Sequence, residues 1–433
     1  MGVSMLFFLQ QMRWALSVVT FFVFHVSFVS GMTLEEIEQL AVQNDPIITK
    51  YQAIAQAAMT ESIADNQWPD PTLRIGQVNL PYSPFSFDKE PMTQMVIGVQ
   101  QVIPSSGLLG QQKEQKLLLA EVYRAQAMDR ALQVLRGLRQ SWMDVYYQTQ
   151  AAFLVKESQE VFSQLVKITQ YQYRAGRGKQ QDVVRAQLEL SFLQDQELQM
   201  NQKREVAIAE LANWVGSSLD ASELSVLFPD LPALPILTDL ESNIEFHPAV
   251  SIEKARLGVT RKGVAIARAK YKPKWMVDLS YGLRFGENMN LNDEGDVVAE
   301  KRSDFLSAMV SVELPFFTKN RQDQRLNARG HEVNAAADSV DVRRRLLHKL
   351  LTTAYANWVR LGERLEFYKT KILPQGAQFS ESSRKAYQSR VSDFSDLTRA
   401  RLRELDSNLL ALALRVERAK AHYDLQYIAG EAQ

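Results

Sequence analysis

One stretch of sixteen residues occurs twice, and it constrains the fold of this chain more than any other feature. The first copy is Tyr173–Leu188 and the second is Tyr387–Leu402, 214 positions later. Five of the sixteen aligned positions are identical, whereas unrelated segments of average composition would share about one. Each copy lies between a long helical pattern and a shorter one. The sequence therefore predicts one structural unit built twice, with both turns at the same end.

Charge and cysteine content exclude several classes of function. Lysine plus arginine and aspartate plus glutamate number 50 each, so the formal net charge is zero. Because no strongly basic face is predicted, we expect no nucleic-acid partner. The chain contains no cysteine, which excludes disulfides, thiolate metal sites, cysteine nucleophiles and a lipid anchor on an N-terminal cysteine.

The N-terminal segment 1–31 has the pattern of a secretory signal peptide. The apolar run Trp14–Val29 follows Arg13, and Val29 and Gly31 occupy the small-residue positions required for cleavage after Gly31. The alternative is a short membrane anchor, although sixteen residues are few for a helical span of about 20. No later segment is apolar over such a length, so the mature chain would cross a membrane only as strands.

The first repeat is expected to span residues 32–216. It opens with a helix capped by Thr33 and continues with a second helix from Pro46. A proline-rich stop then leads into a β-hairpin at 72–103, which the sequence Pro-Ser-Ser-Gly ends. This order predicts a helical pair, one hairpin and then further helices.

A long helix follows this hairpin. Apolar residues recur at steps of three and four without proline from Leu108 to about Ala175, which is typical of a coiled-coil seam. About 67 residues at 1.5 Å each give a rod of roughly 100 Å. Gly176 and Gly178 then turn the chain into another helix, so that long helices occupy 108–215.

Residues 217–240 are expected to link the halves, and residues 241–433 to form the second repeat. The linker is rich in proline and lacks helical periodicity. The second repeat has a hairpin at 276–314 and long helices at 318–428. Its hairpin contains nine more residues than the first, because the offset between matched prolines grows from 202 to 211. We assign these residues to a longer acidic tip at 287–301.

Three further residues are inserted between Pro315 and Tyr387, where the offset between the halves grows from 211 to 214. Two positions fit this insertion equally well. It lies either before the long helix of the second half or within that helix as a local over-winding.

The second hairpin has the clearest strand pattern. In the segments 276–285 and 305–314, apolar residues alternate with polar or small ones. Strands of about nine to eleven residues with one apolar and one polar face are typical of membrane-spanning β-strands. The alternative is a set of half-buried strands in a soluble sheet, but the flanking rods offer no core to cover them.

Four strands in one chain cannot close a barrel, and a bilayer tolerates no open sheet edge. The smallest outer-membrane barrels have about eight strands, so the chain must associate, and three copies would supply twelve. The helices of three copies would form a hollow ring rather than a filled bundle, and they are too long to lie within a bilayer. We therefore expect a channel that crosses an outer membrane and extends into the periplasm.

Four short motifs follow one another between about Thr33 and Gly430. They are the start Thr33–Ile37 with Asn44–Pro46, the strand entries Asp70-Pro71 and Lys272-Pro273, the strand exit Gln101–Pro104 with Gly107, and the turn Tyr173, Gly176, Asp182–Val184 and Ala186-Gln187. Each motif is weak by itself. In this order they make the chain similar to the TolC-like outer-membrane efflux proteins, also called outer membrane factors.

This resemblance implies a mainly α fold with a β-barrel contribution. Each chain would supply four membrane β-strands and long coiled-coil helices to a homotrimer. The trimer would have a twelve-stranded β-barrel in contact with outer-membrane lipid and an α-helical barrel in the periplasm, with the linker in a belt around the helices. The family forms the exit duct of tripartite efflux systems for small molecules or metal ions. Its partners are a periplasmic adaptor (membrane fusion) protein and an inner-membrane transporter, here by analogy of the resistance-nodulation-division (RND) type.

The helix turns form the periplasmic entrance in this family. By position, the resemblance assigns the gate to Gln181, Asp182, Tyr387 and Asp396. Carboxylates from three chains would form a negative ring that favours cations. Asp182 and Asp396 fit equally well as first-turn acids, which stabilise helix N-termini. Gln181 replaces a hydroxyl side chain of TolC, and Arg399 replaces an aspartate.

The adaptor would contact the same turns. The residues expected there are Tyr173, Gly176 and Gly178 in the first copy and Arg390 and Ser392 in the second. Arg390 replaces the usual glycine, and Ser392 stands where TolC has an arginine. We therefore expect the gate to close through contacts that differ from those of TolC.

No residue pattern predicts catalysis, so we expect no enzyme activity, no cofactor and no metal site. None of the histidines 247, 331, 348 and 422 lies at ligand spacing to another. Three other functions remain open: a secreted coiled-coil structural or adaptor protein, the exit duct of a type I protein secretion system, and a hydrolase with helical domains. The last would need a nucleophile and a base that the sequence does not display.

Overall fold

The structure is a computed structural model that describes residues 31–219, 224–291 and 293–430. The predicted signal peptide therefore lies outside the described residues except for Gly31. The chain divides into two compact units. Unit 1 comprises Met1–Ala41, Ser141–Asp230 and Ala377–Leu412, and unit 2 comprises Val42–Gln140, Leu231–Gly376 and Ala413–Gln433. Each unit takes segments from both halves of the chain, and the domain boundaries drawn from the sequence stay a prediction.

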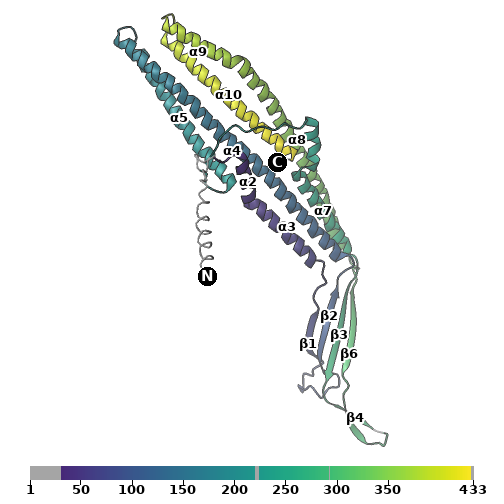
Figure 1. The fold of residues 1–433 in the computed structure, drawn as a ribbon. Coiled ribbons are helices and arrows are strands. Elements are labelled where there is room, and N and C mark those ends of the chain that lie inside the picture. The colour runs from purple at the N-terminus through teal and green to yellow at the C-terminus, as the bar shows by residue number, and fades with distance from the viewer. Residues whose placement is uncertain (1–30, 220–223, 292, 431–433) are drawn as a thin grey trace, which may run out of the picture. The chain divides into compact units, whose positions relative to one another are not determined.

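Unit 1 is helical. It contains most of α2 (Leu34–Asn44), the second part of α4 (Leu108–Arg174), α5 (Gln180–Val215), most of α9 (Leu373–Gln388) and the first part of α10 (Phe394–Ala429) (Figure 1). Helix α2 begins where the sequence predicts, because Thr33 and Glu36 form a reciprocal cap. The Thr33 backbone N–H donates to Glu36 Oε2 at 2.8 Å, and the Glu36 N–H donates to Thr33 Oγ1 at 3.4 Å.

The core of unit 1 explains the period of the long apolar pattern. Helices α4, α5 and α10 each contribute one buried stripe to a single cluster. Its buried members are Val155, Phe162 and Leu165 from α4, Ala186 and Leu193 from α5, and Phe394, Leu397 and Leu405 from α10. Apolar residues at steps of three and four lie on one side of a helix. This spacing therefore keeps the apolar stripe of each helix in contact with the other two helices.

The segment after α5 packs on unit 1 through backbone and ring contacts. Met32 forms a parallel bridge with Leu224, and the Trp142 Nε1–H donates to the Leu227 carbonyl at 3.2 Å. The rings of Tyr146 and Phe228 meet edge to face. Residues 224–230 are therefore held on this unit without regular secondary structure of their own.

Unit 2 contains helices and all the named strands. Its helices are α3 (Pro46–Ala64), the first part of α4, α6 (Leu237–Asn243), η2 (Ile244–Phe246), α7 (Pro248–Ala269), α8 (Gln322–Phe367), η3 (Tyr368–Ile372) and the end of α10. Helix α6 begins at Leu237, inside the range 217–240 predicted as linker. This part of the predicted linker belongs to the core of the unit, because Leu240 is fully buried there. Leu347, Leu351 and Ile428 join the same core from α8 and α10.

The structure locates the three inserted residues. Helix α8 begins at Gln322, which is 214 positions after Leu108 at the start of α4. The insertion therefore lies between Pro315 and Gln322, before the helix, and the over-winding alternative is wrong. The irregular segment that follows α8 is the π-helix η3, which is wound less tightly than an α-helix.

Four strands form one antiparallel sheet in the order β1-β2-β3-β6 (Figure 1). They are β1 (Thr72–Val78), β2 (Gln94–Ile103), β3 (Lys274–Arg284) and β6 (Phe305–Glu313). The two predicted hairpins therefore lie side by side, joined by the pairing of β2 with β3. Strands β1 and β6 are the edges of this sheet.

The longer tip of the second hairpin forms its own small sheet, which the sequence pattern did not reveal. Strand β4 (Glu287–Leu291) pairs with β5 (Val297–Lys301). The buried Arg302 holds the base of this extension, because its Nη1 donates to the carbonyls of Asp88 at 2.8 Å and of Phe285 at 3.0 Å. The arginine thus ties both hairpins together at this end of the sheet.

Candidate functional site

The two helix turns of unit 1 have the same backbone construction. After α4, the Arg177 N–H donates to the Gln172 carbonyl at 2.8 Å, and Gly176 has a φ of +69°. After α9, the Val391 N–H donates to the Ala386 carbonyl at 2.9 Å, and Arg390 has a φ of +60°. This is the Schellman arrangement, in which a left-handed residue ends a helix. The repeat found in the sequence therefore extends to backbone geometry.

Arg390 occupies the position where the first turn has Gly176. The left-handed region costs a residue with a Cβ atom about 1–2 kcal/mol, whereas glycine enters it freely. Space does not require glycine in the first turn, since a Cβ on Gly176 would meet nothing within 4 Å. The second turn therefore carries a conformational strain that the first turn avoids.

Polar contacts join the two turns. The Tyr387 hydroxyl donates to Gln172 Oε1 at 2.7 Å, the Arg185 guanidinium donates to Ser395 Oγ, and Lys179 pairs with Asp393 at 4.0 Å. The Tyr387 ring also packs on Phe394 with a centroid distance of 5.7 Å. The three polar contacts join the α4–α5 hairpin to the α9–α10 hairpin, whereas the ring contact lies within the second hairpin, so the polar side chains hold the turns together.

Of the four predicted gate residues, the structure brings Asp182 and Tyr387 together. Burial raises the pKa of the Tyr387 hydroxyl, and the negative charge of Asp182 raises it further. Tyr387 therefore remains a neutral hydrogen-bond donor at physiological pH. Its counterpart Tyr173 is 47% exposed, and its side chain forms no hydrogen bond or ring contact with the described residues. The two matched tyrosines thus differ in role.

The remaining predicted residues lie at the surface of the turns. Gln181 is exposed, and Asp396 is 52% exposed and pairs with Arg399 at 3.7 Å. Ser392 is partly buried, and its hydroxyl has no hydrogen-bond partner among the described residues. A Cβ on Gly178 would lie 3.0 Å from the Cβ of Gln172, so this glycine permits a close approach within the first turn. The assignments to gate and adaptor stay predictions.

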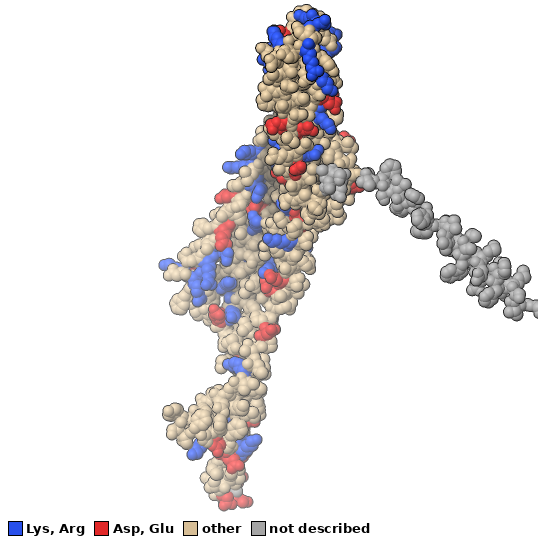
Figure 2. All heavy atoms as spheres, turned by 90° about the vertical axis from the view of Figure 1, so that its left-hand side faces the viewer, with Lys and Arg blue, Asp and Glu red and all other residues tan. Residues whose placement is uncertain are grey.

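Sequence reasoning missed most of the side chains that form the contacts between the two turns. Gln172, Arg185, Ser395, Lys179 and Asp393 were not predicted as site residues, although Arg185 is one of the five identities of the repeat. Figure 2 shows lysine and arginine side chains gathered at the end of this unit. The exposed basic residues of the turns are Arg174, Arg177, Lys179 and Arg390. The carboxylates of the turns thus lie in predominantly basic surroundings.

The second candidate site is the four-stranded sheet of unit 2. Its register aligns apolar side chains across the strands on one face. Leu73 faces Val99 and Val99 faces Leu279, and in the next row Ile75 faces Ile97 and Ile97 faces Tyr281. These six side chains are 41–64% exposed, whereas a sheet with a core buries its apolar face. Neither the helices nor the loops of the described chain cover this face.

The opposite face of the sheet is polar and closely packed. Arg74 on β1 forms an ion pair with Asp278 on β3, and Asp278 is 6% exposed. A Cβ on Gly98, which lies on the strand between them, would approach the Ser280 Cβ to 2.7 Å. Glycine is therefore required at position 98, where β2 and β3 approach each other closely on this face.

None of the helices in the described part of the chain is both long and apolar enough to cross a bilayer. Within residues 31–219, 224–291 and 293–430, no group of three or more histidine or acidic side chains is arranged to hold a metal ion. The two turns and the exposed sheet face are therefore the features from which a function is inferred.

The left-handed position gives the first testable prediction. Replacing Arg390 with glycine removes the strain of the second turn and should raise the free energy of unfolding by about 1 kcal/mol. Replacing Gly176 with alanine introduces the same strain and should lower the stability by about 1 kcal/mol. Thermal unfolding followed by circular dichroism measures both. Gly376→Ala, within α9, is the control, because an alanine there should stabilise the helix. A neutral Arg390→Gly variant would show that the turn is not strained.

Comparison with known proteins identifies the architecture. No family model matches the sequence, and no curated protein matches it either. Solved structures do match: the outer-membrane protein VceC of Vibrio cholerae superposes with a TM-score of 0.75 at 14% identity, covering 92% of this chain and 96% of that one. The outer-membrane channel OprN has a TM-score of 0.74 at 17% identity, with 92% and 89% covered. The outer-membrane channel CmeC of Campylobacter jejuni has a TM-score of 0.74 at 13% identity, with 92% and 85% covered. The chain therefore has the mainly helical fold, with antiparallel β-strands, of the outer-membrane channels that the TolC-like resemblance predicts.

Proposed function

We propose that this protein is a passive exit duct of the bacterial outer membrane, which works as a homotrimer in a tripartite efflux system. The observation that carries this proposal is the uncovered apolar face of the four-stranded sheet. On transfer from water to a hydrocarbon layer, such a face gains about 25 cal/mol for each Å² that it buries. Outer-membrane lipid is an environment that covers this face without any further protein element.

The edges of the sheet support association into a closed ring. Strands β1 and β6 each pair on one side only within the described sheet, which leaves a row of backbone groups on the other side. Lipid cannot satisfy these groups, because it offers no hydrogen-bond partner. The strands alternate in direction from β1 to β6, so β6 of one copy meets β1 of the next in antiparallel fashion. Three copies would close a barrel of twelve strands.

The partners follow from the fold and from the basic turns. The channels with the same fold are outer-membrane proteins, and we infer that this chain likewise reaches from the outer membrane into the periplasm. The turns of unit 1 would be the periplasmic entrance and the docking site for an adaptor that joins the duct to an inner-membrane transporter of the RND type. The cargo would be small molecules or metal ions, and the duct would have no catalytic activity.

The apolar face provides the first test of this proposal. Val310 lies on it and is 60% exposed, whereas the adjacent Met309 lies on the polar face and is 63% exposed. Val310→Arg should destabilise the membrane-embedded protein by about 2–4 kcal/mol. Met309→Arg, the matched control, should have little effect because it adds a cation near Asp278. Yield of assembled protein in the outer-membrane fraction and its resistance to heat measure the difference. Equal behaviour of the two variants would contradict a lipid-facing sheet.

Cysteine cross-linking tests the closure of the barrel, because the native chain has no cysteine. Strands β1 and β6 are separated by two strands in one chain, or about 14 Å at 4.7–4.9 Å per spacing. A disulfide needs Cα atoms within about 7 Å. We expect a chain with one cysteine at Gly76 and a second one scanned over Phe305–Glu313 to form disulfide-linked dimers and trimers at one register. A monomer at every position would rule out pairing of β1 with β6 between copies.

The gate assignment gives a further prediction. If Asp396 contributes to a ring of carboxylates, Asp396→Ala should raise the single-channel conductance or weaken the preference for cations in planar bilayers. Arg399→Ala, which removes the exposed partner of Asp396, should leave the carboxylate in place and shift selectivity in the opposite direction. Unchanged conductance and selectivity in Asp396→Ala would make Asp396 only a first-turn acid of α10.

A further inference from the structure

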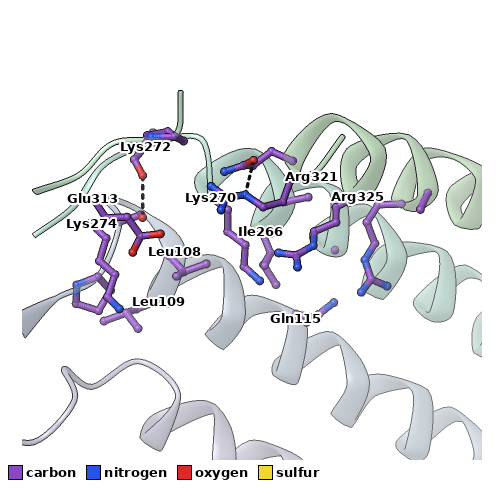
Figure 3. Close-up of a pocket in the computed structure, with 18 of the residues that line it drawn as sticks. Leu108, Leu109, Gln115, Ile266, Lys270, Lys272, Lys274, Glu313, Arg321 and Arg325 are labelled. Atoms are coloured by element: carbon purple, nitrogen blue, oxygen red, sulfur yellow. Dashed lines mark hydrogen bonds between the residues drawn. The ribbon is translucent and has the colours of Figure 1, made fainter. Parts of the chain in front are cut away.

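A cavity of about 860 Å³ lies in unit 2 where the sheet meets helices α4, α7 and α8 (Figure 3). Its walls hold six cationic side chains and two carboxylates. The cations are Lys270, Lys272, Lys274, Arg321, Arg325 and Arg329, and the carboxylates are Glu313 and Glu332. The volume is within the range of about 300–1,000 Å³ found for small-molecule sites. The cavity therefore has both the size and the charge of an anion site.

Most of the available carboxylates are already engaged. Glu332 pairs with Arg329 at 2.6 Å, and Glu313 lies opposite Lys274 in the register of β3 and β6. The neighbouring Asp323 accepts a hydrogen bond from the Tyr271 hydroxyl at 2.5 Å, which raises the pKa of that tyrosine to about 12. Glu313 is thus the one of these three acids without an ion pair or side-chain hydrogen bond among the described residues, and it lies on β6 beside Lys274 rather than on α7 or α8.

Arg329 is the only one of the six cations with an ion pair among the described residues. Of the other five, Lys270, Arg321 and Arg325 lie at the neighbouring ends of α7 and α8. Figure 3 shows the side chains of Lys270 and Arg325 extending into the same space between the helices. Arg321 is the N-cap residue of α8, and Arg325 follows in its first turn. The N-terminus of a helix carries a partial positive charge, so cations there repel it. A bound anion would relieve this repulsion as well as pair with the side chains.

Most of the rest of the lining is apolar, and Ser105, Gln115 and Gln322 are its polar members. Leu108 and Leu109 from α4, Ile266 and Ala267 from α7, and Pro104 and Pro315 from the strand ends line the same cavity. An inorganic ion would leave this surface wet, whereas the apolar body of an organic molecule would cover it. The cavity is thus lined by both apolar and cationic side chains.

The cavity opens on the polar side of the sheet. Lys274 and Glu313 are opposite each other, and their neighbours Trp275 and Val312 form the next pair on the apolar face. Because side chains alternate between the faces of a strand, Lys274 and Glu313 lie away from the side that lipid would cover. A ligand carried by water has access to this side, and a lipid embedded in a bilayer does not.

We propose that this cavity binds amphipathic organic anions, molecules with an apolar body and a carboxylate, sulfonate or phosphate group. Lys270 and Arg325 contact the anionic group, and the α4 and α7 side chains pack on the apolar body. Binding itself does not depend on the proposed duct. Its consequence for transport, a preference for anionic cargo at this level, does rest on the proposed function.

The test compares binding of naphthalene sulfonate with binding of its uncharged analogue naphthyl methanol, by isothermal titration of the full-length protein in nanodiscs. The wild-type protein should bind the sulfonate and bind the alcohol much more weakly. The double variant Lys270→Gln/Arg325→Gln should lose about tenfold or more in affinity, because both charged partners of the anion are removed. Arg325→Lys with native Lys270 should retain most of the binding. Arg345→Gln, an exposed position further along α8, is the matched control and should bind normally.

Three outcomes would overturn the proposal: equal binding of the alcohol, unchanged affinity in the double variant, and binding of short-chain phosphatidylglycerol in place of the sulfonate. The last would make the cavity a lipid headgroup site. Reversal potentials in planar bilayers give an independent readout, since the double variant should shift selectivity toward cations. Absence of any conductance would contradict the duct, while the titrations would still decide the binding site.

Discussion

The unpaired backbone groups along the outer edges of β1 and β6 are the constraint on which the rest of this structure depends. A sheet that is exposed on its apolar face and open at both edges is not stable alone in water or in lipid. Its register places apolar side chains in rows on one side and the Arg74–Asp278 ion pair on the other. The apolar face and the polar face therefore suit two different environments. The two open edges suit pairing with another copy of the chain.

The helices solve a related problem in a different way. Each long helix offers a stripe of apolar residues that a single neighbour cannot cover, so α4, α5 and α10 share one core in unit 1. In unit 2, the cluster around Leu351 and Leu425 joins α8 to α10 in the same manner. Charged side chains lie on the other surfaces of the helices. At the cavity of unit 2, lysine and arginine side chains outnumber the carboxylates. The polar chemistry of this protein thus lies where helices and strands end.

The local structure followed closely from the sequence. The alternation of apolar and polar residues predicted β3 and β6, and the apolar steps of three and four predicted α4 and α5, because both periods come directly from backbone geometry. The β4–β5 hairpin was missed, since its short strands show no alternation between a buried and an exposed face. The contacts of Gln172, Arg185 and Ser395 were also missed, because they depend on which surfaces two distant turns present to each other. Repetition in a sequence reveals shared backbone, but it does not reveal where the copies have acquired different side-chain partners.

Arg390 has a consequence for motion within unit 1. A residue held in the left-handed region stores strain that is released when the turn opens. About 1 kcal/mol of strain corresponds to roughly a fivefold larger population of locally opened turns at equilibrium. The turn after α9 should therefore sample open conformations more often than the turn after α4, whose glycine carries no such strain. Although the two halves share one backbone plan, their turns would fluctuate to different extents.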